Sequence, residues 1–328
     1  MKHRLHPGFW IVLIIVISLG LWPILLQDAA TREVVFTILL AITMAVSLNI
    51  IMGYTGYVSF GHVVFYGLGG YVGMYLIGTL AVPLPFAVLG GGAAAGLLAF
   101  LLGRAILRLR GAYFALVTIG VNEAVRTFIA NFKPFGGPTG IELQFSVYKP
   151  YGGPAHALWL TYYAVAALAI FAIIFSYFIK SSKFGLGLMS IREDEDAAEV
   201  LGIVTPNVKT IAFVFSAFLP GMLGVLFFFK NGNVEPRDAF RLGFSIESLV
   251  MIMLGGQGTL LGPVIGALGY QRLRGVLLTS NAMIGKLPLK DFQLVIAGLL
   301  MLLIILFIPA GLIGWLRQRF PRLRRVLT

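Results

Sequence analysis

The chain has 328 residues, of which 59% are hydrophobic and only 12% are charged. Soluble domains usually carry about 25% charged residues, so the composition excludes an ordinary soluble protein and favours a membrane protein. The formal net charge of +12 is expected to orient apolar spans and to meet anionic membrane lipid rather than nucleic acid. Because there is no cysteine and the four histidines are scattered, neither a disulfide nor a metal site is predicted.

Apolar runs of about 20 residues recur along the chain, and each is long enough to cross a bilayer as a helix. These runs do not alternate polar with apolar residues, as the strands of a membrane β-barrel do. The sequence therefore predicts an all-α, polytopic transmembrane helical bundle that forms a single domain over residues 1–328. The predicted spans are residues 9–26, 34–52, 58–80, 84–103, 112–131, 157–179, 209–229, 244–256, 262–280 and 291–309.

The first apolar run has some features of a secretory signal peptide. No small-residue cleavage site follows it, since the run passes through Trp22-Pro23 and ends at Leu26-Gln27-Asp28. Residues 9–26 are therefore predicted to be a first span that stays in the mature protein.

Basic residues near the ends of the spans predict their orientation, because cytosolic loops are enriched in lysine and arginine. They place both termini, the loop of about 180–208 and the basic tail of 310–328 in the cytosol, and two cytosolic ends require an even number of spans. Glycines interrupt residues 244–280, which form either one span or two. The even count favours two, and about ten spans in all. Arg272 and Arg274 count against this choice, because they fall inside the proposed ninth span. The orienting residues are Lys2, Arg4, Arg104, Arg108, Arg110, Lys180, Lys183, Arg192, Arg317, Arg319, Arg322, Arg324 and Arg325.

Closely spaced glycines between residues 53 and 61 weaken the helix at the end of the second span. A broken helix within a membrane exposes its backbone only where it lines a cavity, and Asn49, Ser59 and His62 would be polar side chains near such a break. The alternative is close helix packing, because glycine and serine let backbones approach each other. Both interpretations stay open at this point.

Asn122, Glu123 and Arg126 lie in the middle of the fifth predicted span. Ionisable residues at that depth are energetically costly and usually face a bundle interior or water. Glu123 and Arg126 are three residues apart, so they can pair on one helical face. The pair is either a structural ion pair, which we favour, or a polar step beside a solute path.

An acidic segment, residues 190–203, follows the sixth predicted span on the cytosolic side. Ser190 can cap a helix whose first-turn acids favour the positive end of the helix dipole, and a glycine suits the helix end. Ile191, Ala198 and Leu201 fall roughly on one face at helical spacing. The segment is thus predicted to be a short amphipathic helix. It is either a solvated connector or a docking helix that enters a groove on a soluble partner.

This acidic segment and the residues after it, "SIREDEDAAEVLGI" and "KTIAFVFSAFLPGMLG", resemble the signature loop of ABC-importer permeases. More narrowly, they are similar to the branched-chain amino acid permease family of the LivM type. Other stretches agree in the same order, between about residue 34 and residue 312. They read "SLNIIMGYTGYVSFGHVVFYGLGGY", "GAYFALVTIGVNEAVRTF", "LGGQGTLLGPVIGA" and "PAGL". Several motifs in matching order are more specific than any one of them.

The resemblance implies the ABC-importer permease fold with a cytosolic coupling helix, in a bacterial inner membrane. The implied partners are a second homologous permease, two cytosolic ATPase subunits and an extracytoplasmic solute-binding protein. No cofactor is expected on this chain, because ATP and Mg²⁺ would be used by the ATPase subunits. The sequence agrees, since it has no G-x-x-x-x-G-K-[ST] phosphate loop. The implied coupling helix consists of Ser190, Ile191, Arg192, Glu193, Asp194, Glu195, Asp196, Ala197, Ala198, Leu201 and Gly202.

The resemblance implies a non-enzymatic subunit that forms half of a translocation path and carries branched-chain or other hydrophobic amino acids by alternating access. Urea or short amides are alternative solutes within the same family. An ion-coupled secondary transporter would need its own coupling acids in the membrane, and the chain offers only Glu123 and Glu247. An intramembrane enzyme is disfavoured, because neither H-E-x-x-H nor Gly-x-Ser-x-Gly occurs. The candidate path residues are Asn49, Ser59, His62, Asn122, Glu123 and Arg126.

Overall fold

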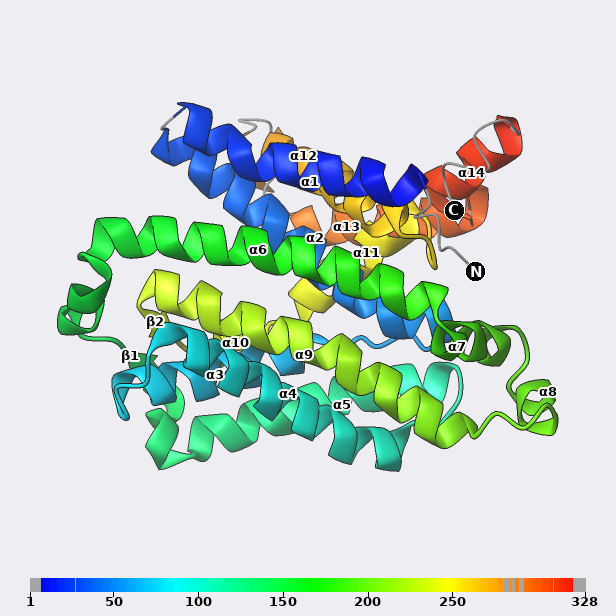
Figure 1. Ribbon diagram of the computed structural model, residues 1–328, viewed down its shortest axis with the longest axis horizontal. Helices are drawn as coiled ribbons and strands as arrows, with labels where there is room; N and C mark the ends of the chain where they lie inside the picture. Colours follow the sequence, from blue (N-terminus) through cyan, green and yellow to red (C-terminus); the bar gives the residue numbers. More distant parts are fainter. Residues whose placement is uncertain are drawn as a thin grey trace.

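The computed structural model describes residues 7–26, 28–279, 283–284, 287–288, 292–308 and 310–320. Lys2, Arg4 and the end of the predicted basic tail, residues 321–328, lie outside the described residues. The described part is mostly α-helical, with short 3-10 helices, loops and two small two-stranded sheets, and its long helices run side by side along the longest axis (Figure 1). The predicted all-α class is therefore confirmed.

The N-terminal helices begin and end where the sequence supplies a cap or a turn. Asp28 caps α2 by accepting hydrogen bonds from the backbone N–H groups of Ala30 and Thr31. Gly56 ends the same helix in the left-handed conformation, with φ of 80°. These elements are α1 (Pro7–Leu26), α2 (Ala29–Thr55), α3 (Val63–Gly78), α4 (Leu84–Ile106), α5 (Ala112–Asn131), η1 (Lys133–Phe135), η2 (Gly137–Thr139), β1 (Ile141–Glu142), η3 (Phe145–Tyr151) and α6 (Pro154–Ser181).

The C-terminal half starts with two short helices and continues with one long one, which Gly232 ends at φ of 77°. The strands pair as antiparallel ladders, β1 with β2 and β3 with β4. These elements are α7 (Lys183–Glu193), α8 (Glu195–Val200), α9 (Thr205–Asn231), β2 (Asn233–Val234), α10 (Pro236–Ala239), α11 (Leu242–Gly255), α12 (Leu261–Thr279), β3 (Met283–Ile284), β4 (Leu287–Pro288), α13 (Gln293–Phe307) and α14 (Gly311–Arg319).

Within the described residues, six helices, α1, α2, α4, α5, α6 and α9, are long and apolar enough to cross a membrane. Helix α3 and residues 295–304 of α13 are apolar but shorter. The described residues 242–279 form two helices, α11 and α12, which separate at a turn with Gly256 and Gly258 at positive φ. The chain is therefore a multi-pass membrane protein, while the count of about ten spans stays a prediction.

The centre of the bundle is formed by α2, which packs against α1, α6, α9, α11 and α12. Beside it, α9 packs closely on α3 and α4 through small residues. A Cβ on Gly69 of α3 or on Gly91 of α4 would collide with the backbone or side chains of α9 around Gly221. Glycine is needed at these positions because the helix backbones almost touch there.

Helix α5 lies at the edge of the bundle, where it contacts α3, α10 and η2. Only a narrow stripe of it is buried, including Phe114, Thr118 and Asn122, while large side chains such as Leu116 and Phe128 are exposed. A Cβ on Gly61, before α3, would collide with the backbone oxygen of Thr118, so α5 is fixed tightly along that stripe. The opposite face of α5 has no partner among the described residues.

The two ends of the molecule differ in character. At one end, β1 pairs with β2 and joins the segment after α5 to the segment after α9. At the other end lie α7, α8, α14 and the beginning of α1 (Figure 1). The described parts nearest to both termini are thus at the same end as the acidic segment (Figure 1), and the predicted cytosolic location of the termini stays a prediction.

Candidate coupling site

The acidic segment forms parts of two helices rather than the single helix that the sequence predicted from Ser190. Ser190 lies inside α7, where its hydroxyl donates to the carbonyl of Leu186 at 3.0 Å. Asp194 has extended backbone, with φ of −157°, and separates α7 from α8. Its carboxylate accepts hydrogen bonds from the N–H groups of Asp196 and Ala197, both at 3.0 Å. The predicted cap at Ser190 is therefore wrong, because Asp194 is the stronger local competitor for the helix N-terminus.

The apolar residues of this segment also divide into two groups. Ile191 and Ala198 are buried against the rest of the chain, with exposed fractions of 3% and 1%. Val200 and Leu201 are 89% and 78% exposed at the end of α8. The expected single face of Ile191, Ala198 and Leu201 is thus wrong: two of these side chains anchor the segment, and the third projects from it.

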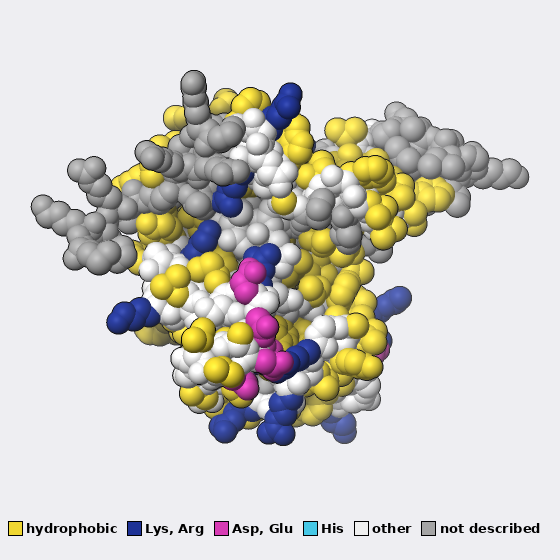
Figure 2. Space-filling view, turned by 90° about the vertical axis from the view of Figure 1, so that its right-hand side faces the viewer, with side chains coloured by type: hydrophobic (Ala, Val, Ile, Leu, Met, Phe, Trp, Pro, Cys, Tyr) yellow, Lys and Arg dark blue, Asp and Glu magenta, His cyan; other side chains and the backbone are white. Residues whose placement is uncertain are grey.

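Seen from this end, the acidic side chains form a narrow row across the middle of the surface, between basic and apolar side chains (Figure 2). The exposed acids of α7 and α8 lie beside the exposed apolar end of α8. We call this surface, residues 193–204, the α8 surface. Its mixed acidic and apolar character suits contact with a soluble protein better than contact with lipid.

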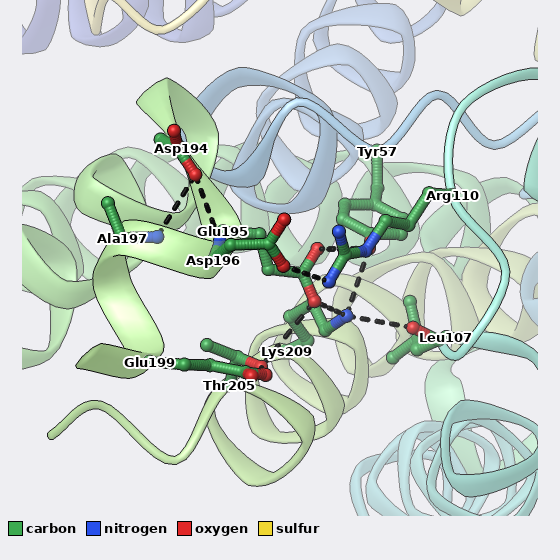
Figure 3. Close-up of polar contacts among 10 residues, drawn as sticks. All are labelled: Tyr57, Leu107, Arg110, Asp194, Glu195, Asp196, Ala197, Glu199, Thr205 and Lys209. Atoms are coloured by element: carbon green, nitrogen blue, oxygen red, sulfur yellow. Dashed lines mark hydrogen bonds and ion pairs between the residues drawn. The ribbon is translucent and has the colours of Figure 1, made fainter.

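A buried polar network fixes α8 to the rest of the bundle (Figure 3). Lys209 is only 3% exposed, and its Nζ lies 2.5 Å from Glu195 Oε1 and 2.8 Å from the carbonyl oxygen of Leu107. The Nζ also donates to the Tyr57 hydroxyl at 2.9 Å, and Tyr57 in turn donates to Glu195 Oε2 at 2.7 Å. One buried lysine thus connects α9, α8, the α4–α5 loop and the α2–α3 loop.

Arg110 closes this network on its solvent side. Its Nη2 lies 2.8 Å from Asp196 Oδ1 and its Nε lies 3.4 Å from Glu195 Oε2. Nearby, Thr205 at the start of α9 donates to Glu199 Oε1 at 2.5 Å. Because only Gly111 separates Arg110 from α5, α8 is connected through side chains to the beginning of that edge helix.

The network determines the charge state of its central carboxylate. Burial alone would raise the pKa of Glu195, but hydrogen bonds from Lys209 and Tyr57, with the charges of Lys209 and Arg110, outweigh it and lower the pKa below its usual value. Burial and the contact with Glu195 raise the pKa of Tyr57. A hydrogen bond from Arg110 lowers the pKa of Asp196. Glu195 and Asp196 are therefore ionised at neutral pH, and Tyr57 keeps its proton.

A second connection joins α7 to two breaks between helices, one between α2 and α3 and the other between α11 and α12. Arg192 Nη1 donates to the carbonyl of Gly53 at 2.7 Å, close to Gly258 in the turn between α11 and α12. Asn49 accepts from the N–H of Gly258 at 3.0 Å and donates to the carbonyl of Thr259 at 3.1 Å. The breaks at the end of α2 and after α11 therefore face each other. Asn49, a candidate path residue, holds them together.

Ser59 and His62, also candidate path residues, are buried at the break between α2 and α3. Among the described residues the Ser59 hydroxyl has no hydrogen-bond partner, and the ring nitrogens of His62 have none of normal geometry, although the ring lies close to the backbone of Ser216. The His62 ring packs edge-on against Phe65, with centroids 5.3 Å apart. Buried polar groups are usually satisfied, so this location stays a candidate for contact with water or solute.

On α5, the three candidate path residues point in two directions. Asn122 is buried and donates to the carbonyl of Phe240 at 3.0 Å. Glu123 and Arg126 form the predicted ion pair on one helical face, and both are partly exposed. That face points away from the bundle interior of this chain. The pair belongs to the unpartnered face of α5.

The sequence prediction missed the members of the buried network outside the acidic segment, namely Tyr57, Arg110 and Lys209. One signal was available: Lys209 begins a predicted span that is otherwise free of charge until Lys230.

A second buried charge, Glu247 on α11, lies 3.5 Å from Arg274 Nη1. Within the described residues, no group of three or more histidine, aspartate or glutamate side chains is suited to hold a metal ion.

Residues 31–305 match the model of the family described as "Branched-chain amino acid transport system / permease component". The chain is 28% identical to the high-affinity branched-chain amino acid transport system permease protein LivM of Escherichia coli, over 94% of this chain and 76% of that protein. It is 25% identical to the probable branched-chain amino acid transport permease protein LivM of Methanocaldococcus jannaschii, over 67% of this chain and 66% of that one. The permease protein LivH of Salmonella typhimurium is 28% identical over 48% of this chain and 46% of its own length. No solved structure matches the chain.

Proposed function

Because the chain belongs to the family of permease components of branched-chain amino acid transport systems, we propose that it is a membrane subunit of an ATP-driven importer for branched-chain or other hydrophobic amino acids. The relatives are permease components and not enzymes, so ATP and Mg²⁺ are assigned to separate ATPase subunits. The proposed assembly has this chain and a second homologous permease in a bacterial inner membrane. Two cytosolic ATPases and an extracytoplasmic solute-binding protein complete it.

The observation that carries this proposal is the exposed α8 surface on a rigid base. Val200 and Leu201 project at its tip, while Glu195 below them is held by Lys209 and Arg110. An exposed apolar tip is suited to a pocket on a soluble partner. Because the base of α8 is buried and fixed by the network, a displacement of α8 is transmitted to the bundle instead of being absorbed by bending. This supports contact between α8 and an ATPase subunit.

The network also supports a route by which ATPase movement reaches the translocation path. A displacement of α8 acts on α9 through Lys209 and on the start of α5 through Arg110. A displacement of α7 acts through Arg192 on the helix breaks at Gly53 and Gly258. Alternating access would follow if the two permeases rocked against each other between outward and inward states, each favoured by a different nucleotide state.

The unpartnered face of α5 supports an assembly with a second permease. Glu123 and Arg126 on this face would be costly to expose to lipid, and a protein partner or water removes that cost. The proposed path therefore runs between α5 and the partner permease, with Glu123 and Arg126 beside it. The family match disfavours an ion-coupled secondary transporter, and urea or short amides stay the alternative solutes.

The test of this function replaces Val200 and Leu201 together with serine, in the complete transporter. We expect the ATPase subunits to co-purify several-fold less with the membrane subunits, and uptake of isoleucine to fall with them, because the apolar contact is lost. Phe145→Ser is the matched control, since Phe145 is 81% exposed in η3 at the other end of the molecule. It should leave ATPase co-purification unchanged. Wild-type co-purification and uptake by a well-expressed double variant would refute the docking role of the α8 surface.

A further inference from the structure

A cavity of about 370 Å³ opens between α2, α3, α9 and α11, and residues of β2 and α10 also line it. These last two elements lie away from α7 and α8 (Figure 1). Its volume is at the lower end of the range for small-molecule sites, about 300–1,000 Å³. The wall combines aromatic rings, carboxylates and guanidinium groups. None of the residues that line this cavity belongs to the coupling site or to the unpartnered face of α5.

The apolar part of the wall is a cluster of rings around Tyr66 of α3. The centroid of the Tyr66 ring lies 5.8 Å from that of Phe227, 5.3 Å from that of Phe228 and 5.3 Å from that of Phe244. Tyr66 and Phe228 are almost fully buried, so the rings form a fixed surface. Such a surface suits a small apolar group, which gains by leaving water.

Two guanidinium groups form one charged part of the cavity wall. Arg241 and Arg274 line it, and both approach the buried carboxylate of Glu247, at 4.0 Å and 3.5 Å. The two guanidinium groups share the single carboxylate of Glu247, which can neutralise only one of their two positive charges. A guanidinium held in place by a buried carboxylate is suited to receive the carboxylate of a ligand.

The other charged part of the wall is acidic. Glu235 precedes α10 and Asp238 lies within it, and both line the cavity and are exposed. Neither side-chain carboxylate forms an ion pair or hydrogen bond with any of the described residues. Acceptors without a partner at the mouth of a cavity are suited to an ammonium group.

We propose that this cavity is a low-affinity binding site for a zwitterionic amino acid with a small apolar side chain, an inference that rests on the proposed function. The ligand carboxylate would pair with Arg241 and Arg274, its ammonium group with Glu235 and Asp238, and its side chain would lie on the ring cluster around Tyr66. The site would receive solute after its release from the binding protein, ahead of the path beside α5.

The experiment uses the complete transporter in nanodiscs without binding protein, and isoleucine as the probe. Saturation-transfer difference NMR detects weak binding and reports Kd by titration. In the wild type we expect isoleucine to bind, and N-acetylisoleucine and isoleucine amide to compete poorly, because each lacks one of the two charges. The Glu235→Gln/Asp238→Asn variant should bind isoleucine about tenfold more weakly. Arg241→Gln should weaken it in the same direction while Arg274 still pairs with Glu247.

Glu142→Gln is the matched control, because Glu142 is an exposed carboxylate of β1 that does not line this cavity. It should keep the wild-type Kd. Wild-type uptake of isoleucine with binding protein present, but no binding to the complex alone, would overturn this site and leave the proposed function intact. Unchanged isoleucine binding by the variants, with loss only of ATPase stimulation by liganded binding protein, would also overturn it and assign the charges to protein docking. Failure of the wild-type transporter to import any amino acid would instead refute the proposed function.

Discussion

At the scale of single residues, Glu195 and Lys209 determine how α8 is held. The Glu195 carboxylate accepts from Lys209 and Tyr57 and lies within ion-pair distance of Arg110, and its side chain is only 11% exposed. Lys209 has three oxygen partners for its three N–H groups, so its buried ammonium is fully satisfied. Such a network is stable only when complete, because each remaining member loses a partner when one is removed.

Lys209→Met tests this network, because methionine keeps the apolar stem but removes the charge and the donors. We expect a loss of about 2 kcal/mol in stability, since Glu195 and the Leu107 carbonyl lose a buried partner. Thermal unfolding of the purified complex would show a lower Tm. Lys183→Met is the control, because Lys183 is exposed at the start of α7. We also expect ATP hydrolysis to continue with less uptake per ATP. Wild-type Tm and wild-type coupling in Lys209→Met would contradict the role of the network.

The lowered pKa of Glu195 predicts a dependence of stability on pH. A carboxyl whose pKa is lower in the folded than in the unfolded protein contributes stability above its unfolded pKa, near 4.5, and loses it as pH falls through its folded pKa. The Tm difference between wild type and Glu195→Gln should therefore be constant above about pH 6 and shrink below about pH 4. Titration of carboxylates outside this network cancels in this difference. A difference that stays the same through the acid range would show that Glu195 is not held as its ionised form.

At the scale of elements, the sequence predicted where helices lie better than how they end. Long apolar runs predicted α1, α2, α4, α5, α6 and α9, because the ability of a segment to cross a membrane as a helix depends on its own length and composition. Glycines left residues 244–280 open to one span or two, and the structure has two helices there, α11 and α12, within the described residues. The acidic segment was harder, because Ser190 and Asp194 both suit a helix N-terminus and only the backbone conformation at Asp194 decides between them.

The buried network was not predictable from spacing for a different reason. Lys209 is 152 residues from Tyr57 and 102 residues from Leu107 along the chain. Helical periodicity relates residues three or four apart, and it contains no information on contacts between distant helices. The Glu123–Arg126 pair was predictable only in part for the same reason. Its spacing predicted the contact, but which way its face points depends on how α5 packs at the edge of the bundle.

At the scale of the whole molecule, two exposed faces of the bundle differ in polarity. The face of α4 is apolar from Leu84 to Gly103, and Leu97 is 62% exposed on it. The face of α5 has a comparable exposed leucine, Leu116 at 64%, but also carries the Glu123–Arg126 pair. Lipid suits the first face, whereas an ion pair in the second favours protein or water next to it.

This difference predicts that α5, and not α4, meets the second permease. The chain has no cysteine, so Leu116→Cys and Leu97→Cys each introduce one site for a spin label. In the assembled transporter, the label on α5 should be immobile and poorly accessible to oxygen, and its spectrum should change when ATP hydrolysis is trapped with vanadate. The label on α4 should be mobile, accessible to oxygen from the lipid and unaffected by vanadate. Because both leucines are about equally exposed in the isolated chain, a label on α5 as mobile and as accessible to oxygen as the label on α4 would mean that α5 faces lipid. The Glu123–Arg126 pair would then be a structural ion pair on a lipid-facing surface, and the path would have to run elsewhere.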